Sequence, residues 1–217
     1  GESAPLDDCF WEELAELDPD DVCRRSAAGW TGESYQIRIL GRDYLLTPGE
    51  RRLIHAEAIS REEEESVVSG LCFVAVHYLL NARDVPPAGE LVGASELKGG
   101  KLFFSAGAHS PDFSSLEEIF SASPEAMVRA AEALGGGEVA HGDIAVEVRA
   151  LPRLPISFVF WREDEEFPAS VSMLFDRTAE SQLPLDVILA LGQETMRRLV
   201  AGAREEKAQL PNSEEDR

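Results

Sequence analysis

Three strand-like runs follow one another between residues 143 and 176, with no helical pattern between them. In the first run, residues 143–150, apolar and charged residues alternate, which predicts a strand with one exposed face. The second run, ISFVFW at 156–161, is apolar on both faces, and SVSMLF follows at 170–175. Because no crossover helix separates these strands, we expect them to pair in an antiparallel sheet.

Helical patterns lie on both sides of this stretch. Residues 62–81 follow a capping box at Ser60 and are apolar nearly all round from Val67 onward, which predicts a buried central helix. From Leu185 onward, apolar residues share one helical face and predict a long C-terminal helix. The sequence therefore predicts an α+β fold with a mostly antiparallel sheet, packed by the central helix and the C-terminal helix.

Capping and turn residues predict the shorter elements. Asp18-Pro19 separates two short N-terminal helices, since Asp favours the N-cap and Pro the first helical position. Alternating runs about Gly41-Arg42 predict a β-hairpin, and two short strands, ELVGASEL and KLFFSAG, flank Gly99-Gly100. A capping box at Ser114 and the pair Ser123-Pro124 each predict the start of a helix.

These elements divide the chain into three segments. We expect a helical segment at residues 1–30, a single α+β domain at 31–204 and a disordered acidic tail at 205–217. A chain of 217 residues buries enough surface to fold without disulfides.

The charge of the chain excludes two classes of partner. It has 41 acidic and 20 basic residues, a net charge of -21, with no lysine or arginine patch, so nucleic acid and anionic membrane surfaces would be repelled. The longest apolar run, within Leu71–Leu80, is too short to span a bilayer, and the first residues have no signal-peptide pattern. Three cysteines without a CxxC pair favour a reducing compartment, so we expect a cytoplasmic protein.

A dense carboxylate cluster occupies residues 163–166, between the last two strands. Two carboxylates about 4 Å apart repel by roughly 4 kcal/mol at an effective dielectric of 20. The cluster therefore either points into solvent at a hairpin tip, which we favour, or gathers around an arginine or a cation such as Ca²⁺ or Mg²⁺. Asp164 and Glu166 are the candidate ligands. Asp176 ends the next strand, and antiparallel pairing would place it at the opposite end.

Three other side chains are candidate ligand-binding residues. Arg153 lies in a stiff Pro-Arg-Leu-Pro corner at 152–155, which positions it to pair with a carboxylate, either within the protein, which we favour, or on a ligand. His77 lies in the buried helix, where a histidine is more often a core residue than a ligand. Trp161 ends the buried strand beside the carboxylate cluster.

Motifs that would identify a cofactor are missing from the sequence. There is no HExxH or paired-cysteine spacing, so zinc and iron–sulfur sites lack support. The glycine-rich stretch at 134–143 lacks the GxGxxG order, and GGK at 99–101 lacks the rest of a P-loop, so nucleotide binding lacks support as well. No GxSxG elbow indicates a nucleophilic serine. The cofactor, if the protein has one, is unknown.

The chain resembles an uncharacterised prokaryotic family, domain-of-unknown-function family 3786. The features that carry this resemblance are the proline corner at 152–155, the strand ending in Trp161, the acidic turn closing in Glu-Phe-Pro at 166–168, and Leu-Phe-Asp at 174–176. Weaker similarity lies in HYLL at 77–80. The resemblance implies no activity, because the family has none established. Some relatives look fused to a cysteine-rich iron–sulfur module, which this chain lacks, so a link to iron–sulfur or corrinoid metabolism is only an association.

We therefore expect an accessory or binding module, non-enzymatic, that binds a small molecule or a partner protein near the proline corner and the acidic turn. The alternative is a carboxylate-based enzyme or a divalent-cation-binding protein that uses the acidic turn. A third interpretation is purely structural, with function in an interface between copies of the chain. The sequence identifies no ligand and does not distinguish an enzyme from a binding protein. It is also compatible with a homo-oligomer.

Overall fold

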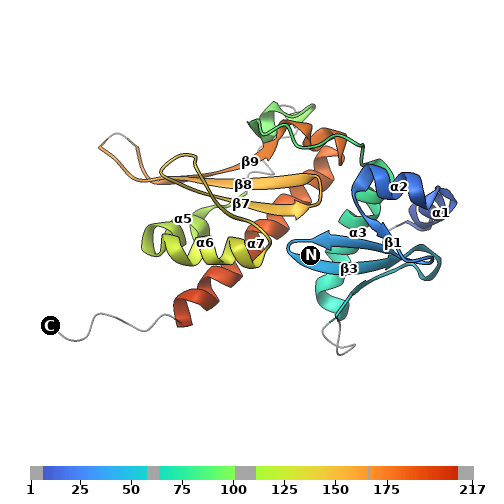
Figure 1. Ribbon diagram of the computed structural model, residues 1–217. Coiled ribbons are helices and arrows are strands. Elements are labelled where there is room, and N and C mark those ends of the chain that lie inside the picture. Colours follow the sequence, from blue (N-terminus) through green and yellow to red (C-terminus); the bar gives the residue numbers. More distant parts are fainter. Residues whose placement is uncertain (1–6, 58–63, 101–110, 166, 210–217) are drawn as a thin grey trace.

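The computed structural model of the protein describes residues 7–57, 64–100, 111–165 and 167–209. Helices and two antiparallel sheets make up this part, which confirms the predicted α+β fold (Figure 1). The helices are α1 (Asp8–Glu16), α2 (Pro19–Ser26), α3 (Glu64–Asn81), α5 (Ser114–Ala122), α6 (Pro124–Ala133) and α7 (Leu185–Gln209).

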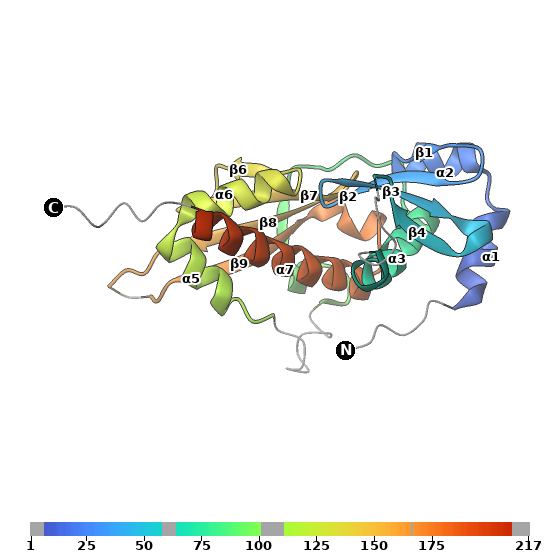
Figure 2. The same cartoon turned by 90° about the horizontal axis from the view of Figure 1, so that it is seen from below.

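The larger sheet has five antiparallel strands in the order β5-β9-β8-β7-β6. Their bounds are β5 (Leu91–Gly93), β6 (Gly137–Val139), β7 (Ile144–Leu151), β8 (Leu154–Trp161) and β9 (Ser170–Asp176). Every residue of the central strand β8 except Trp161 is buried, as its apolar sequence predicted. Phe160 stacks on Phe120 of α5, with ring centroids 5.2 Å apart. Helices α5, α6 and α7 cover this face of the sheet (Figure 2).

The smaller sheet is a meander of β1 (Gly29–Trp30), β2 (Tyr35–Ile39), β3 (Arg42–Thr47) and β4 (Arg52–His55). Strands β2 and β3 form the predicted hairpin, although the turn residues are Leu40 and Gly41, one position earlier than expected. Both have positive φ, 48° and 78°, as a type I′ turn requires. A Cβ atom on Gly41 would lie 2.7 Å from the backbone of Leu134, so the approach of this turn to the end of α6 also needs glycine.

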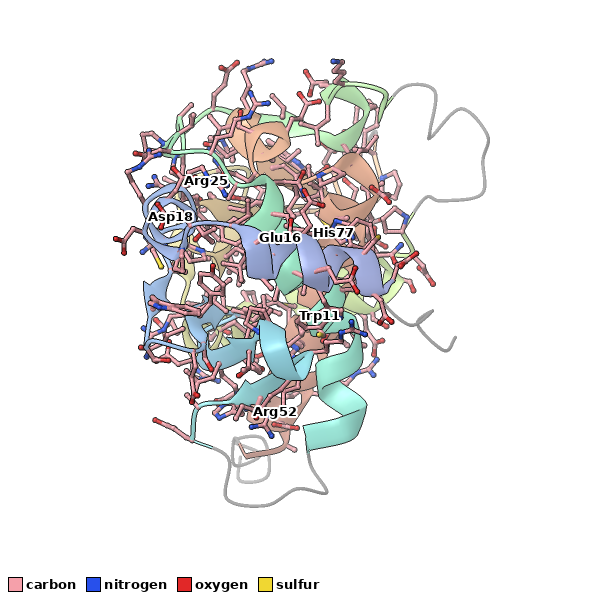
Figure 3. All side chains as sticks on the ribbon, turned by 90° about the vertical axis from the view of Figure 1, so that its right-hand side faces the viewer. Trp11, Glu16, Asp18, Arg25, Arg52 and His77 are labelled. Atoms are coloured by element: carbon pink, nitrogen blue, oxygen red, sulfur yellow. The ribbon has the colours of Figure 1, made fainter. Side chains whose placement is uncertain are left out.

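Helix α3 is the central helix that its apolar sequence predicted. It contacts α1, α2, β4 and α7. Figure 3 shows Trp11 of α1 and His77 of α3 where these two helices cross. Its neighbour α7 is the predicted long C-terminal helix and lies along the helix-covered face of the larger sheet (Figure 2). No helix in the described ranges is both long and apolar enough to cross a membrane.

Two helix ends differ from the prediction. Ser114 does not form a capping box, because Asp112 accepts the hydrogen bond from the Ser114 N–H at 3.0 Å, and a carboxylate is a favoured acceptor at a helix start. Helix α7 continues past Arg204, where the tail was expected to begin, to Gln209. Its last turns are held by Glu206, which pairs with Arg129 of α6 at 2.9 Å.

The segment around β5 also differs. Only Leu91–Gly93 is a strand, because Glu96 accepts a hydrogen bond from the Gly93 N–H at 2.8 Å and closes a short 3₁₀ turn after it. The second strand expected here (residues 101–107), the capping box at Ser60 and the residues after 209 lie outside the described part.

Candidate functional site

The proline corner forms the tight turn between β7 and β8. Leu151 pairs with Leu154 across the turn, so Pro152 and Arg153 are its two central residues. Pro155 pairs with Arg149 of β7 but lies just beyond the last pairing of β8 with β9. The missing N–H of this proline therefore falls where β8 has a neighbour on one side only, as expected for proline in a sheet.

Arg153 connects this turn to three other segments. Its backbone N–H donates to the Tyr78 hydroxyl at 3.2 Å, and that hydroxyl donates to the Ser26 carbonyl at 2.8 Å. The guanidinium Nη2 lies 2.6 Å from Asp84 and donates to the Arg24 carbonyl at 3.1 Å. Burial raises the pKa of Tyr78, so its hydroxyl stays protonated and able to donate. The side chain of Arg153 thus pairs within the protein, as we favoured.

Asp176 anchors the other side of the corner. Its carboxylate is 1% exposed and accepts hydrogen bonds from the backbone N–H groups of Ala88, Gly89 and Thr178 and from the Thr178 hydroxyl, at 2.6–3.0 Å. Burial acts to raise the pKa of Asp176, but these hydrogen bonds outweigh it and the pKa is lowered. The carboxylate therefore holds the segment around residues 88–89 against the end of β9.

A groove of about 580 Å³ lies on the face of the larger sheet that the helices leave uncovered. Side chains alternate along strands, so this face carries the residues between those that pack on the helices. One wall is the segment at 87–91, and the other is the loop at 139–141. A Cβ atom on the next residue, Gly142, would lie 2.5 Å from Val159, which shows how closely this loop approaches β8. Pro152 and Pro155 close one end, beside Asp176.

Three polar side chains of the groove have no side-chain partner within the described ranges. Ser157 on β8 is fully buried, and its hydroxyl has no hydrogen-bond partner among the described residues. Glu147 of β7 lies directly across from it, and Arg149 lies two residues further along the same strand. Neither of these charged side chains forms an ion pair or hydrogen bond with another residue that the structure describes.

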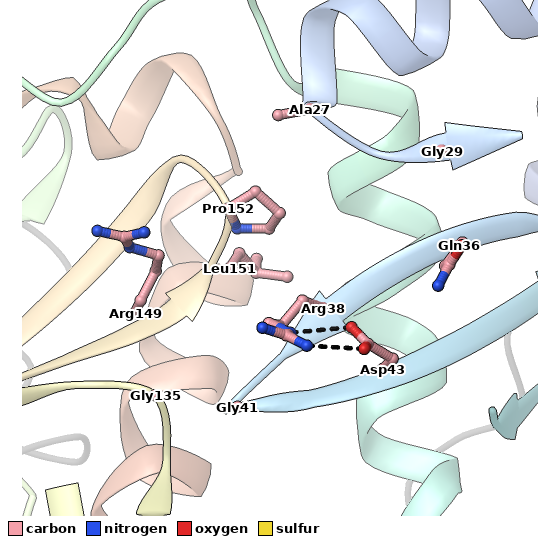
Figure 4. Close-up of a pocket in the computed structure, with 10 residues that line it drawn as sticks. All are labelled: Ala27, Gly29, Gln36, Arg38, Gly41, Asp43, Gly135, Arg149, Leu151 and Pro152. Carbon is pink, nitrogen blue, oxygen red and sulfur yellow. Dashed lines mark hydrogen bonds and ion pairs between the residues drawn. The ribbon is translucent and has the colours of Figure 1, made fainter. Parts of the chain in front are cut away.

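A second cavity, of about 400 Å³, lies between the two sheets and shares Arg149 and Pro152 with the groove. Figure 4 shows that Arg149 and the Arg38–Asp43 pair lie on opposite sides of Pro152. Arg38 donates to both carboxylate oxygens of Asp43, at 2.9 and 2.7 Å, so its guanidinium is already occupied. The Leu40 N–H donates to the Ala150 carbonyl at 3.1 Å and fixes the sheets beside this cavity. Of the two described arginines that line these spaces, Arg149 is therefore the one still available to a ligand.

The predicted site residues do not come together. Arg153 and Asp176 lie at the corner end of β8 and β9, whereas Trp161 and Asp164 lie at the opposite end. Since β8 has eight residues, roughly 25 Å separates the two ends. The expected separation of Asp164 from Asp176 by antiparallel pairing is what the structure shows, and only Asp176 lines the groove.

His77 lies far from this groove, packed between the rings of Phe10 and Phe73, whose centroids are 4.6 and 4.4 Å from its own. Burial lowers the pKa of His77, although the negative charges of Asp186 and Glu13 act to raise it. A neutral imidazole between two phenylalanine rings is a core side chain, which agrees with the interpretation we considered the more frequent one.

The acidic turn is an exposed hairpin tip. Asp164 and Phe167 close it, with the Phe167 N–H donating to the Asp164 carboxylate at 2.8 Å and the Asp164 N–H to the Phe167 carbonyl at 3.0 Å. Glu163 and Glu165 are exposed, and Glu166 lies outside the described residues. Within those residues, no group of three or more His, Cys, Asp or Glu side chains is placed to hold a metal ion.

The sequence reasoning missed Glu147, Arg149 and Ser157 as site residues. The alternation of residues 143–150 correctly placed Glu147 and Arg149 on one face of the strand, but nothing in it indicated that this face is part of a groove. Ser157 carried a signal that could have been used, because it is the one polar residue within an otherwise apolar, buried run.

Comparison of the chain with protein-family models gives a match. A family model described as Domain of unknown function (DUF3786) matches residues 18–198, which include both ends of the β8–β9 hairpin and the groove. This match covers most of the chain and confirms the resemblance that the sequence features indicated. No curated protein and no solved structure matches the chain.

Proposed function

The chain belongs to the DUF3786 family, a domain of unknown function, and we propose that it is a binding module that holds a small molecule in the groove on its larger sheet. The observation that carries this proposal is the Ser157 hydroxyl at the floor of the groove, which is buried and has no hydrogen-bond partner among the residues that the structure describes. An unsatisfied buried hydroxyl costs about 1–3 kcal/mol, and a ligand that hydrogen-bonds to it would recover part of that cost.

The size and lining of the groove support a small ligand. Its volume of about 580 Å³ lies in the range of small-molecule sites, which combine apolar walls with a few polar groups. The apolar part here comes from prolines at 87, 152 and 155 together with Leu91 and Val139. The polar part is supplied mainly by Ser157, Glu147 and Arg149. Because Ser157 is fully buried, a ligand that contacts it must displace the side chains that cover it.

The same groove favours binding over catalysis. A nucleophilic serine needs a base within hydrogen-bond reach, and the Ser157 hydroxyl has no partner in the described part of the chain. Asp176, the carboxylate nearest the prolines, already accepts four hydrogen bonds and is stabilised as an anion, so it is a poor candidate for proton transfer.

A cytoplasmic location is part of the proposal. Cys9, Cys23 and Cys72 are all free thiols, and Cys9 is exposed. Burial raises the pKa of Cys72 to about 11, so this thiol is unreactive at neutral pH. Free thiols that need no pairing suit a reducing compartment.

The test is a thermal-shift screen of small molecules, followed by calorimetric titration of those that raise the melting temperature. We expect Ser157→Ala to keep or raise the melting temperature, since it removes an unsatisfied hydroxyl, and to weaken ligand binding about 3- to 10-fold. Ser172→Ala is the matched control. Ser172 is on the neighbouring strand β9 and lies on the same face of the sheet as Ser157, but it does not line the groove. Equal binding by Ser157→Ala and wild type would contradict the proposal.

A further inference from the structure

Two opposite charges face the groove from one strand. Glu147 and Arg149 are two residues apart on β7, so their side chains lie on the same face with Cα atoms roughly 6.6 Å apart. Side chains of opposite charge at this spacing can reach each other, yet these two do not form an ion pair. With respect to the described part of the chain, the groove therefore presents the Arg149 guanidinium and the Glu147 carboxylate as unpaired charges at separate positions.

A ligand with a single charge fits this arrangement poorly. An anion would pair with Arg149 but would bring its charge close to Glu147, and a cation would pair with Glu147 but approach Arg149. A neutral apolar molecule would take both charges and the Ser157 hydroxyl out of water without replacing their hydrogen bonds, which is costly. A molecule that carries both charges matches each one with its opposite.

The structure points to a small zwitterion as the ligand, and we infer that its ammonium and carboxylate groups are separated by about the length of a dipeptide. An extended dipeptide spans roughly 7 Å, two residues at about 3.3–3.6 Å each, which is close to the roughly 6.6 Å between the Cα atoms of Glu147 and Arg149, from which the two side chains extend on the same face. In this arrangement Arg149 binds the carboxylate, Glu147 binds the ammonium group, and the Ser157 hydroxyl lies across from Glu147 at the ammonium end. This inference rests on the proposed function, because it names the ligand class of the same groove.

The charge of Asp176 does not disturb this assignment. Asp176 also lines the groove, but four donors from Ala88, Gly89 and Thr178 surround its carboxylate. It therefore serves as part of the wall, and Glu147 is the carboxylate that remains available to a ligand.

The experiment compares three probes by calorimetric titration: alanyl-alanine, its N-acetyl form, which is only an anion, and its amide, which is only a cation. We expect each blocked form to bind about 10- to 100-fold more weakly than the zwitterion, because each loses one charge-assisted hydrogen bond. A fourth probe, 5-aminopentanoate, separates its charges by a similar length without a peptide bond. Equal binding of this probe would show that charge spacing, and not the peptide group, is recognised.

Variants assign the two ends. We expect Arg149→Gln to weaken the zwitterion and the N-acetyl probe while leaving the amide unchanged, and Glu147→Gln to weaken the zwitterion and the amide while leaving the N-acetyl probe unchanged. Arg162→Gln and Glu163→Gln are matched controls, since both residues are exposed at the far end of β8. A blocked probe that binds as tightly as the zwitterion, or variants that affect all probes alike, would overturn the inference.

The outcomes separate the two proposals. If the peptides and 5-aminopentanoate do not bind but another small molecule binds in a way that depends on Ser157, the zwitterion inference fails and the proposed function stands. If neither these probes nor any screened molecule binds, both fail.

Discussion

The two ends of strand β8 are built in opposite ways. At the corner end, Arg153 and Asp176 are largely buried and bonded to segments distant in sequence. At the other end, the side chains are in water: Trp161 is 50% exposed and Phe167 is 66% exposed. The hydrogen bonds that close the acidic turn join Asp164 and Phe167, three residues apart in the chain. The acidic turn, whose run of charges stands out in the sequence, is therefore held by fewer long-range contacts than the proline corner.

The difference shows that charge density alone does not make a site. Asp176 and Asp164 are the same residue type on the same hairpin, yet Asp176 has four donors around a buried carboxylate, whereas Asp164 closes an exposed turn. What distinguishes them is the position of each relative to the rest of the fold. Asp176 accepts hydrogen bonds from residues 88–89, which are distant in sequence, whereas Asp164 accepts one from Phe167, three residues away.

The largest expected effect is that of Asp176→Ala. It removes a buried carboxylate that accepts four hydrogen bonds, including those from the backbone N–H groups of Ala88 and Gly89, so we expect the free energy of unfolding to fall by about 3 kcal/mol. Asp164→Ala, the matched change at the exposed end, removes the acceptor of the Phe167 N–H in a solvent-exposed turn and should lower it by about 1 kcal/mol. Denaturant unfolding of both variants measures the two values. Similar losses would remove the distinction between the two ends.

The arginines allow a second, smaller test. Arg153→Ala breaks the pair with Asp84 and the bond to the Arg24 carbonyl, and we expect a loss of about 2 kcal/mol, less than for a fully buried pair because Asp84 is half exposed. Arg162, at the exposed end, is the control, and its change to alanine should cost about 0.5 kcal/mol or less. Thermal and denaturant unfolding give both figures. If the Arg162 variant were the less stable one, the corner would not be the constrained end.

Much of the fold could be predicted because local patterns determine it. The apolar run at 156–161 predicted the central strand, the helical run that is apolar all round predicted α3, and Gly41 predicted the β2–β3 hairpin. Each of these patterns depends only on residues that are neighbours in the sequence. Helix ends were less predictable. Asp112 replaced Ser114 as the acceptor, and the contact of Glu206 with Arg129 extended α7, because both depend on competition or on tertiary contacts.

The site was less predictable for the same reason. The sequence identifies Arg153 and Asp176 as candidate ligand-binding residues, but their partners come from Tyr78, Asp84 and the segment at 88–89. A single sequence does not show which distant segments meet. The groove depends on a loop and a proline segment that cover the open face of the sheet. In the sequence alone, Glu147 and Arg149 therefore resemble ordinary solvent-facing residues, because only folding brings the strands and the walls of the groove together.

The pH dependence of stability provides a further test of the role of Asp176 at the corner end. The folded-state pKa of Asp176 lies below the ordinary value of 3.8, so its contribution is fully present above about pH 4 and is lost as pH falls through the folded pKa. We therefore expect the difference in free energy of unfolding between wild type and Asp176→Asn to be largest above pH 4 and to shrink on acidification. Urea unfolding from pH 5 to pH 2.5 checks this. If the difference in free energy of unfolding grew toward low pH instead, this prediction would be contradicted.

The smallest effect is expected from divalent cations at the exposed end. Glu163 and Glu165 are exposed and need no cation to relieve their repulsion, which water screens to about 1 kcal/mol for a close pair. Mg²⁺, Ca²⁺ and Mn²⁺ should therefore raise the melting temperature no more than NaCl of equal ionic strength, since a net charge of -21 responds to any added salt. A larger rise with one cation, lost in Asp164→Asn but kept in Asp176→Asn, would move the binding site to the acidic turn. That result would reverse the roles of the two ends, because the exposed tip would then be the ligand-binding site and the corner would have only a structural role.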